Sequence, residues 1–292
     1  MNRLRGSRRG VTIVELLIAM VIAAALGAAT LSLMLSQSRF AERAEGQRAG
    51  RRVGRSAVNA LANDLRMVDP SWGIEAASAT SITVKVPYAM GVICASTALL
   101  QTIEVLPVDS VAFAMPGYSG FAARASDGSY TTYSGGTVTE IAVPSTCSVT
   151  AGITTITAPS DAPNQKSRAV TIVTIGAPVL AVGTPVMFYR RTQFYFGASN
   201  QNGLSGRTAL WRNYLSSGSA AVELAAPFSN TAAFRFFNLS ATTSQTAVPS
   251  PLSDIKGFEL YLPGQSDNSS RQKGAPEQAN LTTAVFLVNR SS

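Results

Sequence analysis

The N-terminal part of the chain divides into an apolar run and a helical repeat. The apolar run extends from Leu16 to Leu35, and Glu15 is the only charged residue between Val11 and Ser38. An apolar stretch of more than about 18 residues is typical of a membrane-spanning helix. Further along, apolar residues recur at steps of four, four, four and three, the spacing of one buried helical face. They are Val53, Ala57, Leu61, Leu65 and Val68.

These two patterns predict one continuous helix. No proline occurs between Gln37 and Val68, whereas the Asp69-Pro70 pair is a strong stop signal. A helix from Val11 to about Val68 would be roughly 85 Å long at 1.5 Å per residue. Its first half should lie in a membrane, and its second half should pack on a globular head.

Three glycines fall inside the predicted helix at a spacing of four residues, so they lie on nearly one face. They are Gly46, Gly50 and Gly54. Each weakens an isolated helix by about 1 kcal/mol relative to alanine. Two interpretations stay open. The glycines let another helix approach closely or soften the stalk, or they are a tolerated weak point.

Beyond Pro70 the composition favours strands and turns. Short segments rich in β-branched and aromatic residues alternate with turn signals, which predicts a mainly antiparallel β head and an α+β fold class. The polar span Pro263–Asn280 separates two of these segments and is predicted to be disordered, with partner contact as the alternative. The expected strands are Ser81–Val86, Thr102–Leu106, Thr137–Val143, Ile153–Thr157, Ala169–Ile175, Pro185–Phe196, Ala209–Tyr214, Ala233–Phe237, Gly257–Leu262 and Leu281–Asn289.

The formal charge of +8 is concentrated near the N-terminus. Four arginines precede Gly10, and seven arginines face three acids between Arg39 and Arg66. The remainder from Met67 onward is close to neutral, so we expect no nucleic-acid partner. The arginine-rich stretch could attract anionic lipid head groups. Because a basic flank stays in the cytoplasm, the rest of the chain should lie on the other side of the membrane.

Little in the sequence favours catalysis. The chain has no histidine, which excludes Ser-His-Asp and Cys-His pairs and histidine-based zinc sites. Three aspartates, Asp109, Asp127 and Asp161, show no metal-loop spacing, so we expect no metal and no cofactor. In an exported chain the two cysteines, Cys94 and Cys147, predict a disulfide. Two buried free thiols are the alternative.

The N-terminal motif provides the most specific signal. Arg3, Arg5, Arg8 and Arg9 form a short basic leader before Gly10, Val11 opens an apolar run, and Glu15 is the fifth residue after Gly10. This arrangement resembles the class III signal of type IV prepilins and of the pseudopilins of type II secretion. Those proteins usually begin their mature chain with Phe, so Val11 is a departure. A secretory signal is cut after its apolar region, whereas the candidate cleavage position after Gly10 precedes the apolar run. A plain signal anchor with an accidental glutamate is the alternative.

The resemblance assigns roles to three residues. Gly10–Val11 is the bond that a prepilin peptidase would cut, and the new amine of Val11 would be N-methylated. Glu15 would be the assembly group, because a carboxylate in hydrocarbon needs a partner and the family supplies the amino terminus of a neighbouring subunit. Pairing of Glu15 with the amine of its own Val11 is the alternative. The implied division is leader 1–10, transmembrane and stalk helix 11–68 and β-rich head 69–292.

The length and the apolar pattern of the C-terminal half are similar to the large minor pseudopilins, namely the J-type component of type II secretion and the W-type minor pilin. The resemblance implies a structural subunit with a single span in the bacterial inner membrane and its head in the periplasm or an extracellular filament. Its implied partners are a prepilin peptidase, other pilin subunits, the inner-membrane assembly platform and membrane lipid. The alternatives are a signal-anchored adhesin that enters no filament and a membrane-anchored enzyme.

Overall fold

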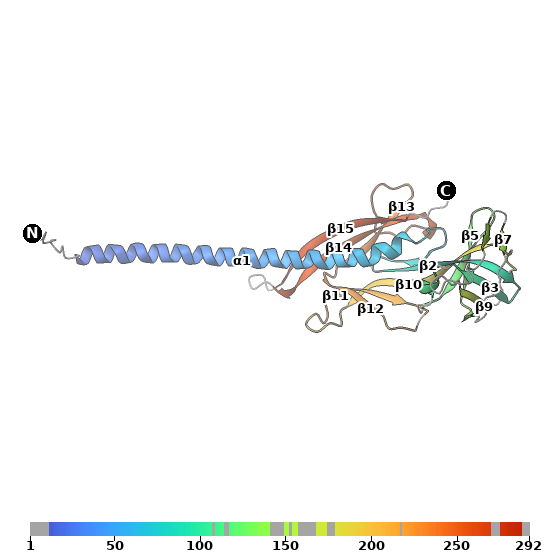
Figure 1. The fold of residues 1–292 in the computed structure, drawn as a ribbon. Helices are drawn as coiled ribbons and strands as arrows, with labels where there is room; N and C mark the ends of the chain where they lie inside the picture. The colour runs from blue at the N-terminus through green and yellow to red at the C-terminus, as the bar shows by residue number, and fades with distance from the viewer. Residues whose placement is uncertain are drawn as a thin grey trace, which may run out of the picture.

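The protein consists of one long helix that ends in an elongated β head (Figure 1). The computed structural model describes residues 12–106, 109–113, 117–140, 149–151, 154–156, 168–173, 179–216, 218–269 and 275–287. The helices are α1 (Ile13–Arg66), the short α2 (Ser110–Phe113) and the 3-10 turn η2 (Leu252–Asp254). The strands are β1 (Ile74–Ala77), β2 (Ser81–Ser96), β3 (Leu100–Val105), β4 (Gly120–Arg124), β5 (Tyr130–Ser134), β6 (Thr137–Glu140), β7 (Val149–Ala151), β8 (Thr154–Ile156), β9 (Arg168–Val173), β10 (Pro185–Ala198), β11 (Thr208–Tyr214), β12 (Val222–Phe228), β13 (Ala233–Asn238), β14 (Ile255–Ser269) and β15 (Pro276–Phe286).

Helix α1 is continuous and confirms the predicted long helix. It ends at Arg66, two residues before the predicted limit, where the Met67 N–H bonds to the Asp64 carbonyl oxygen and the Val68 N–H bonds to the Leu65 carbonyl oxygen. The turn that follows is held by Asp69, whose carboxylate accepts hydrogen bonds from the Ser71 backbone N–H and hydroxyl at 2.8 and 2.6 Å. The chain therefore leaves the helix at the predicted Asp69-Pro70 signal.

The strands form a mostly antiparallel sheet, as predicted. Within the described residues thirteen strands join one sheet, whose main path runs β13-β14-β12-β11-β10-β2-β3-β9-β6. Strands β1, β15, β4 and β5 branch from that path, and β7 pairs with β8 alone. Each predicted strand overlaps an observed one. Strands β1, β4, β5, β7 and β12 had no counterpart in the sequence analysis.

The described part of the head contains two large hydrophobic cores and a small third cluster of Trp72, Ala122 and Tyr189. The first lies against α1 and includes the helical residues Ala57, Leu61 and Leu65 together with phenylalanines from β10, β12, β13 and β14. The second lies at the end of the head distant from the helix and joins β2, β3, β4 and β10. The predicted helical face is therefore correct: Ala57, Leu61, Leu65 and Val68 are fully buried, and Val53 packs against the same core.

Strands β2 and β10 connect the two cores. Val84 of β2 and Phe194 of β10 belong to the core beside the helix, whereas Ile93 of β2 and Phe188 of β10 belong to the distant one. The antiparallel register of this pair shifts between Phe188 and Tyr189. The irregularity thus falls where the strands pass from one core to the other.

The prediction of a disordered span at Pro263–Asn280 was wrong for most of its length. Strand β14 continues to Ser269 and β15 begins at Pro276, and the two pair in register from Leu262–Leu281 to Gln265–Gln278. Residues 270–274 lie outside the described residues. The polar composition misled the prediction, because a paired strand that extends beyond a core needs few apolar side chains. The hairpin lies along α1 (Figure 1).

Candidate functional site

The candidate site is helix α1, and its described start is a capping box. Thr12 is the N-cap, and its hydroxyl accepts a hydrogen bond from the Glu15 N–H at 3.2 Å. The Glu15 carboxylate accepts in turn from the Thr12 N–H at 3.4 Å. Such a reciprocal pair satisfies two backbone donors that a helix start otherwise leaves open. It also places a negative charge in the first turn, where the helix dipole favours it.

Sequence reasoning found Glu15 but missed its partner. The signal was present, because Thr12 and Glu15 have the Thr-x-x-Glu spacing of a capping box. Gly10 and Val11 lie outside the described residues, so the cleavage site and the alternative pairing of Glu15 with the Val11 amine stay predictions.

The first half of α1 exposes an apolar surface on all sides. Met20, Val21 and Leu33 are each more than 60 % exposed, and every described residue from Thr12 to Arg43 is exposed. The helix is long and apolar enough to cross a membrane, with a mean hydropathy of 2.4 over its best window. The Thr30 hydroxyl bonds back to the Leu26 and Gly27 carbonyl oxygens at 3.0 and 2.9 Å, so this polar group is satisfied within the helix.

The second half of α1 is fixed to the head through its glycines. A Cβ on Gly50 would lie 2.6 Å from the Gly264 carbonyl oxygen, and one on Gly46 would lie 2.9 Å from the Glu277 Cβ. A Cβ on Gly54 would lie 3.0 Å from a methyl group of Leu281. The three glycines therefore allow the β14–β15 hairpin to approach the helix. Close approach was one predicted interpretation, but the element that approaches is a hairpin instead of a helix.

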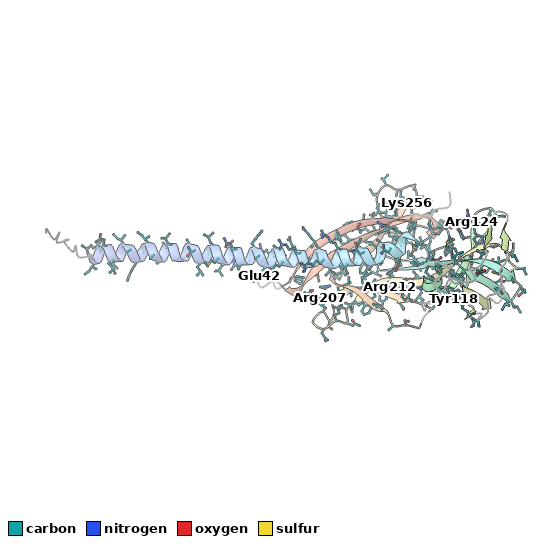
Figure 2. The ribbon with its side chains drawn as sticks, in the orientation of Figure 1. Glu42, Tyr118, Arg124, Arg207, Arg212 and Lys256 are labelled. Carbon is teal, nitrogen blue, oxygen red and sulfur yellow. The ribbon has the colours of Figure 1, made fainter. Side chains whose placement is uncertain are left out.

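An ion pair joins the last turns of α1 to the sheet. Arg212 of β11 lies 3.8 Å from the Asp64 carboxylate, and Figure 2 labels Arg212 below the helix. Burial raises the pKa of the Asp64 carboxyl above its usual value, and the nearby Arg212 and Arg190 guanidiniums oppose that rise. The pair contributes orientation more than stability, because both side chains keep some contact with solvent.

The remaining predicted positions form no second site. Cys94 lies in β2 and Cys147 lies outside the described residues, so the disulfide stays a prediction. In the described part of the chain no group of three or more acidic or cysteine side chains is arranged to hold a metal ion. Asp127 is on an exposed turn, where the Ser129 hydroxyl and backbone N–H donate to its carboxylate and lower its pKa.

Comparison with known families matches residues 5–31 to the prokaryotic N-terminal methylation motif. No curated protein and no solved structure matches the chain. The matched residues contain Gly10, Val11 and Glu15 together with much of the exposed apolar half of α1.

The N-terminus is therefore a type IV prepilin-like signal, as the residues themselves indicated. Such a motif implies processing by a prepilin peptidase and assembly with other pilins, and it points to a structural subunit. The single apolar helix in the described residues fits a single-pass membrane anchor of the prepilin type.

Proposed function

We propose that the chain is a minor pilin or pseudopilin, a structural subunit that enters a type IV pilus or a type II secretion pseudopilus. One observation carries the proposal: a prepilin-like signal begins a helix whose apolar first half is exposed from Ile13 to Phe40. An apolar surface of this size needs lipid or protein around it. A membrane would surround the helix before assembly, and the helices of other subunits would surround it afterwards.

Processing is the first step of the proposed function. A prepilin peptidase would cut between Gly10 and Val11 at the cytoplasmic face of the inner membrane, and Val11 would then be N-methylated. Cleavage creates a cationic amine one residue before Thr12. The capping box holds the Glu15 carboxylate at the same end of the helix. A neighbouring subunit's amine would therefore meet a carboxylate that is already oriented.

The size of the head supports a minor role, in a tip or initiating complex, over that of the repeated subunit. The head joins two cores in series and extends well beyond the end of α1 (Figure 1). An elongated head is easier to accommodate at the end of a filament than at every position along it. The inner-membrane assembly platform and the other pilin subunits are the proposed partners.

The proposal is tested by following the full chain through processing and shearing. With its peptidase present, the chain should lose ten residues, begin at a methylated Val11 and appear with pilins in sheared or assembled material. Gly10→Leu should leave the precursor uncut in the membrane. Gly6→Leu is the matched control, because it makes the same change inside the leader and should be processed normally.

Two outcomes would overturn the proposal. A mature N-terminus beyond Leu35 would mean that the apolar helix is removed. A correctly processed chain that never leaves the membrane fraction with other pilins would instead favour a signal-anchored adhesin.

A further inference from the structure

Four arginines form a basic surface on the second half of α1. We call them the arginine face, and they are Arg48, Arg51, Arg52 and Arg55. All four side chains are exposed, although this part of the helix is packed on the head. At about 100° of rotation per residue they point roughly 140° away from Gly50, Gly54, Ala57 and Leu61, which are the buried residues of the same turns. The head therefore leaves the arginine face uncovered.

The arginine face has no ion-pair partner among the described residues. Its members are spaced by three and four residues, so each guanidinium lies beside others of the same charge, which destabilises a helix. Glu45 is the one acid at helical spacing, three residues before Arg48. Asp64 is already paired with Arg212. A surface that carries this repulsion is suited to binding an opposite charge from outside the chain.

The surface around the arginines excludes an apolar partner. From Gln47 to Arg66 every fully exposed residue of α1 is polar. The nonpolar residues in this span are buried or half-buried against the head. An apolar docking helix would find nothing to cover here, whereas a carboxylate would find several guanidiniums that can each bind it with two hydrogen bonds.

The position along the helix argues against lipid as the ligand. Arg48 follows Leu35, the last residue of the apolar run, by thirteen residues, which is about 20 Å of helix. Surface charges are screened over about 8 Å at physiological ionic strength. Arg39 and Arg43 are near enough to reach head groups, but the arginine face of an upright helix is not.

A second copy of the chain also fits poorly. Between Phe40 and Arg66 the exposed acids of α1 are Glu42 and Glu45, two carboxylates against four arginines. Figure 2 labels Glu42 where the bare helix meets the head. A matching surface would need a denser row of acids than α1 carries.

We propose that the arginine face binds a carboxylate-rich surface on a different protein subunit that lies beside the stalk. The inference rests on the proposed function, because it requires an assembly that brings another subunit against α1. The stalk would then have two recognition elements. Its apolar half gives affinity for any pilin-like neighbour, and the arginine face selects the neighbour with complementary charge.

The test uses the full processed chain in its native membrane, with a photo-crosslinking residue at Asn59. Asn59 is exposed and lies one turn beyond Arg55 on the same side of α1. The measurement is the yield and identity of the cross-linked product, with the contacted segment mapped by mass spectrometry. The expected product is a different protein subunit joined through an acidic segment.

The charge requirement is tested by replacing all four arginines with glutamine. Glutamine has similar helix propensity, so the head should stay as resistant to protease as before. The cross-link to the acidic segment should fall by roughly tenfold or more. The matched control replaces the same four arginines with lysine, which keeps the charge and should retain most of the product.

Several results would overturn the inference. They are cross-links to lipid, to nucleic acid or to a second copy of the chain, and an equal yield from the glutamine and lysine variants. Co-fractionation with pilins in sheared material is measured in parallel. If the chain still co-fractionates with pilins while the cross-link proves independent of charge, the inference fails and the proposed function stands. If the chain does not co-fractionate with pilins while the charge-dependent cross-link remains, the proposed function fails instead.

Discussion

The two halves of α1 belong to one helix but are stabilised in different ways. From Ile13 to Phe40 the side chains are exposed and mostly apolar. From Gly46 to Leu65 one face is buried against the β14–β15 hairpin and the first core. The first half therefore depends on lipid or on other subunits for its environment, whereas the second half is part of the head.

The comparison teaches that the same residue type has opposite roles along the helix. A leucine in the first half is exposed surface, whereas Leu61 and Leu65 in the second half are core. Gly27 has open space around it, whereas Gly50 touches a backbone. Substitutions matched between the halves should therefore separate assembly from folding.

The largest effect is expected at Glu15. Glu15→Gln removes the charge but keeps the capping box, since glutamine also bonds back to the N-cap N–H. We expect normal processing and an unchanged head. Entry into the assembly should weaken by about 3–5 kcal/mol, because a neighbour's amine would lose its counter-ion in a low-dielectric environment. The measurement is recovery of other pilins with the purified chain. Equal recovery with both forms would rule out charge pairing.

A loss of head stability is expected at Leu61, which is fully buried. Leu61→Ala should destabilise the head by about 2–5 kcal/mol through lost contacts and a cavity. Leu31→Ala is the matched control in the exposed half and should leave head stability unchanged. Denaturant unfolding of the full chain in detergent measures both. Similar losses at the two positions would mean that the halves are not independent.

A smaller effect is expected at the glycines. Gly50→Ala places a methyl group against the Gly264 backbone and should cost about 1–3 kcal/mol in the stability of the helix–hairpin contact. Gly27→Ala meets no atom within 4 Å and should strengthen the helix by about 1 kcal/mol. Amide exchange along the hairpin and α1 would report both changes. An unaffected hairpin in Gly50→Ala would show that the close approach is not required.

The smallest expected effect is a pH dependence of the free energy of unfolding, which arises from Asp64 in the second half of α1. Because burial raises the pKa of Asp64 in the folded state, the folded protein holds this proton more tightly than the unfolded chain does. In the window just above the ordinary carboxyl pKa, this group therefore makes the free energy of unfolding fall as the pH rises. Asp64→Asn should remove that slope. The check is unfolding between about pH 4 and pH 6, and equal slopes in both proteins would contradict it.

The sequence was most informative where chemistry or periodicity is local. The prepilin-like signal, the long helix and its face at Ala57, Leu61 and Leu65 could all be predicted, because helical spacing shows directly which side is buried. The strands were found where β-branched and aromatic residues cluster. Strand β4, with the sequence Gly-Phe-Ala-Ala-Arg, lacks that composition, and its pairing with β10 decides its conformation.

The element that packs against Gly46, Gly50 and Gly54 could not be predicted. Gly46, Gly50 and Gly54 indicate that something approaches, but the hairpin residues against Gly46 and Gly50 are polar or small. Gly264, Ser266 and Ala279 look like loop residues until β14 and β15 are paired. The sequence analysis interpreted these arginines only as part of a basic stretch that could attract anionic lipid, because the outward direction of the arginine face depends on which side of α1 the head covers.

Strands β2 and β10 have a mechanical consequence. Strand β2 has sixteen residues and is roughly 50 Å long at about 3.3 Å per residue, so it runs through both cores along the length of the head (Figure 1). A pulling force applied between the stalk and the far end of the head would act nearly parallel to these strands. Their cross-strand hydrogen bonds would then bear the load together, in shear, and would not open one after another. Under such a force the two large cores would share the load, because both strands belong to each of them.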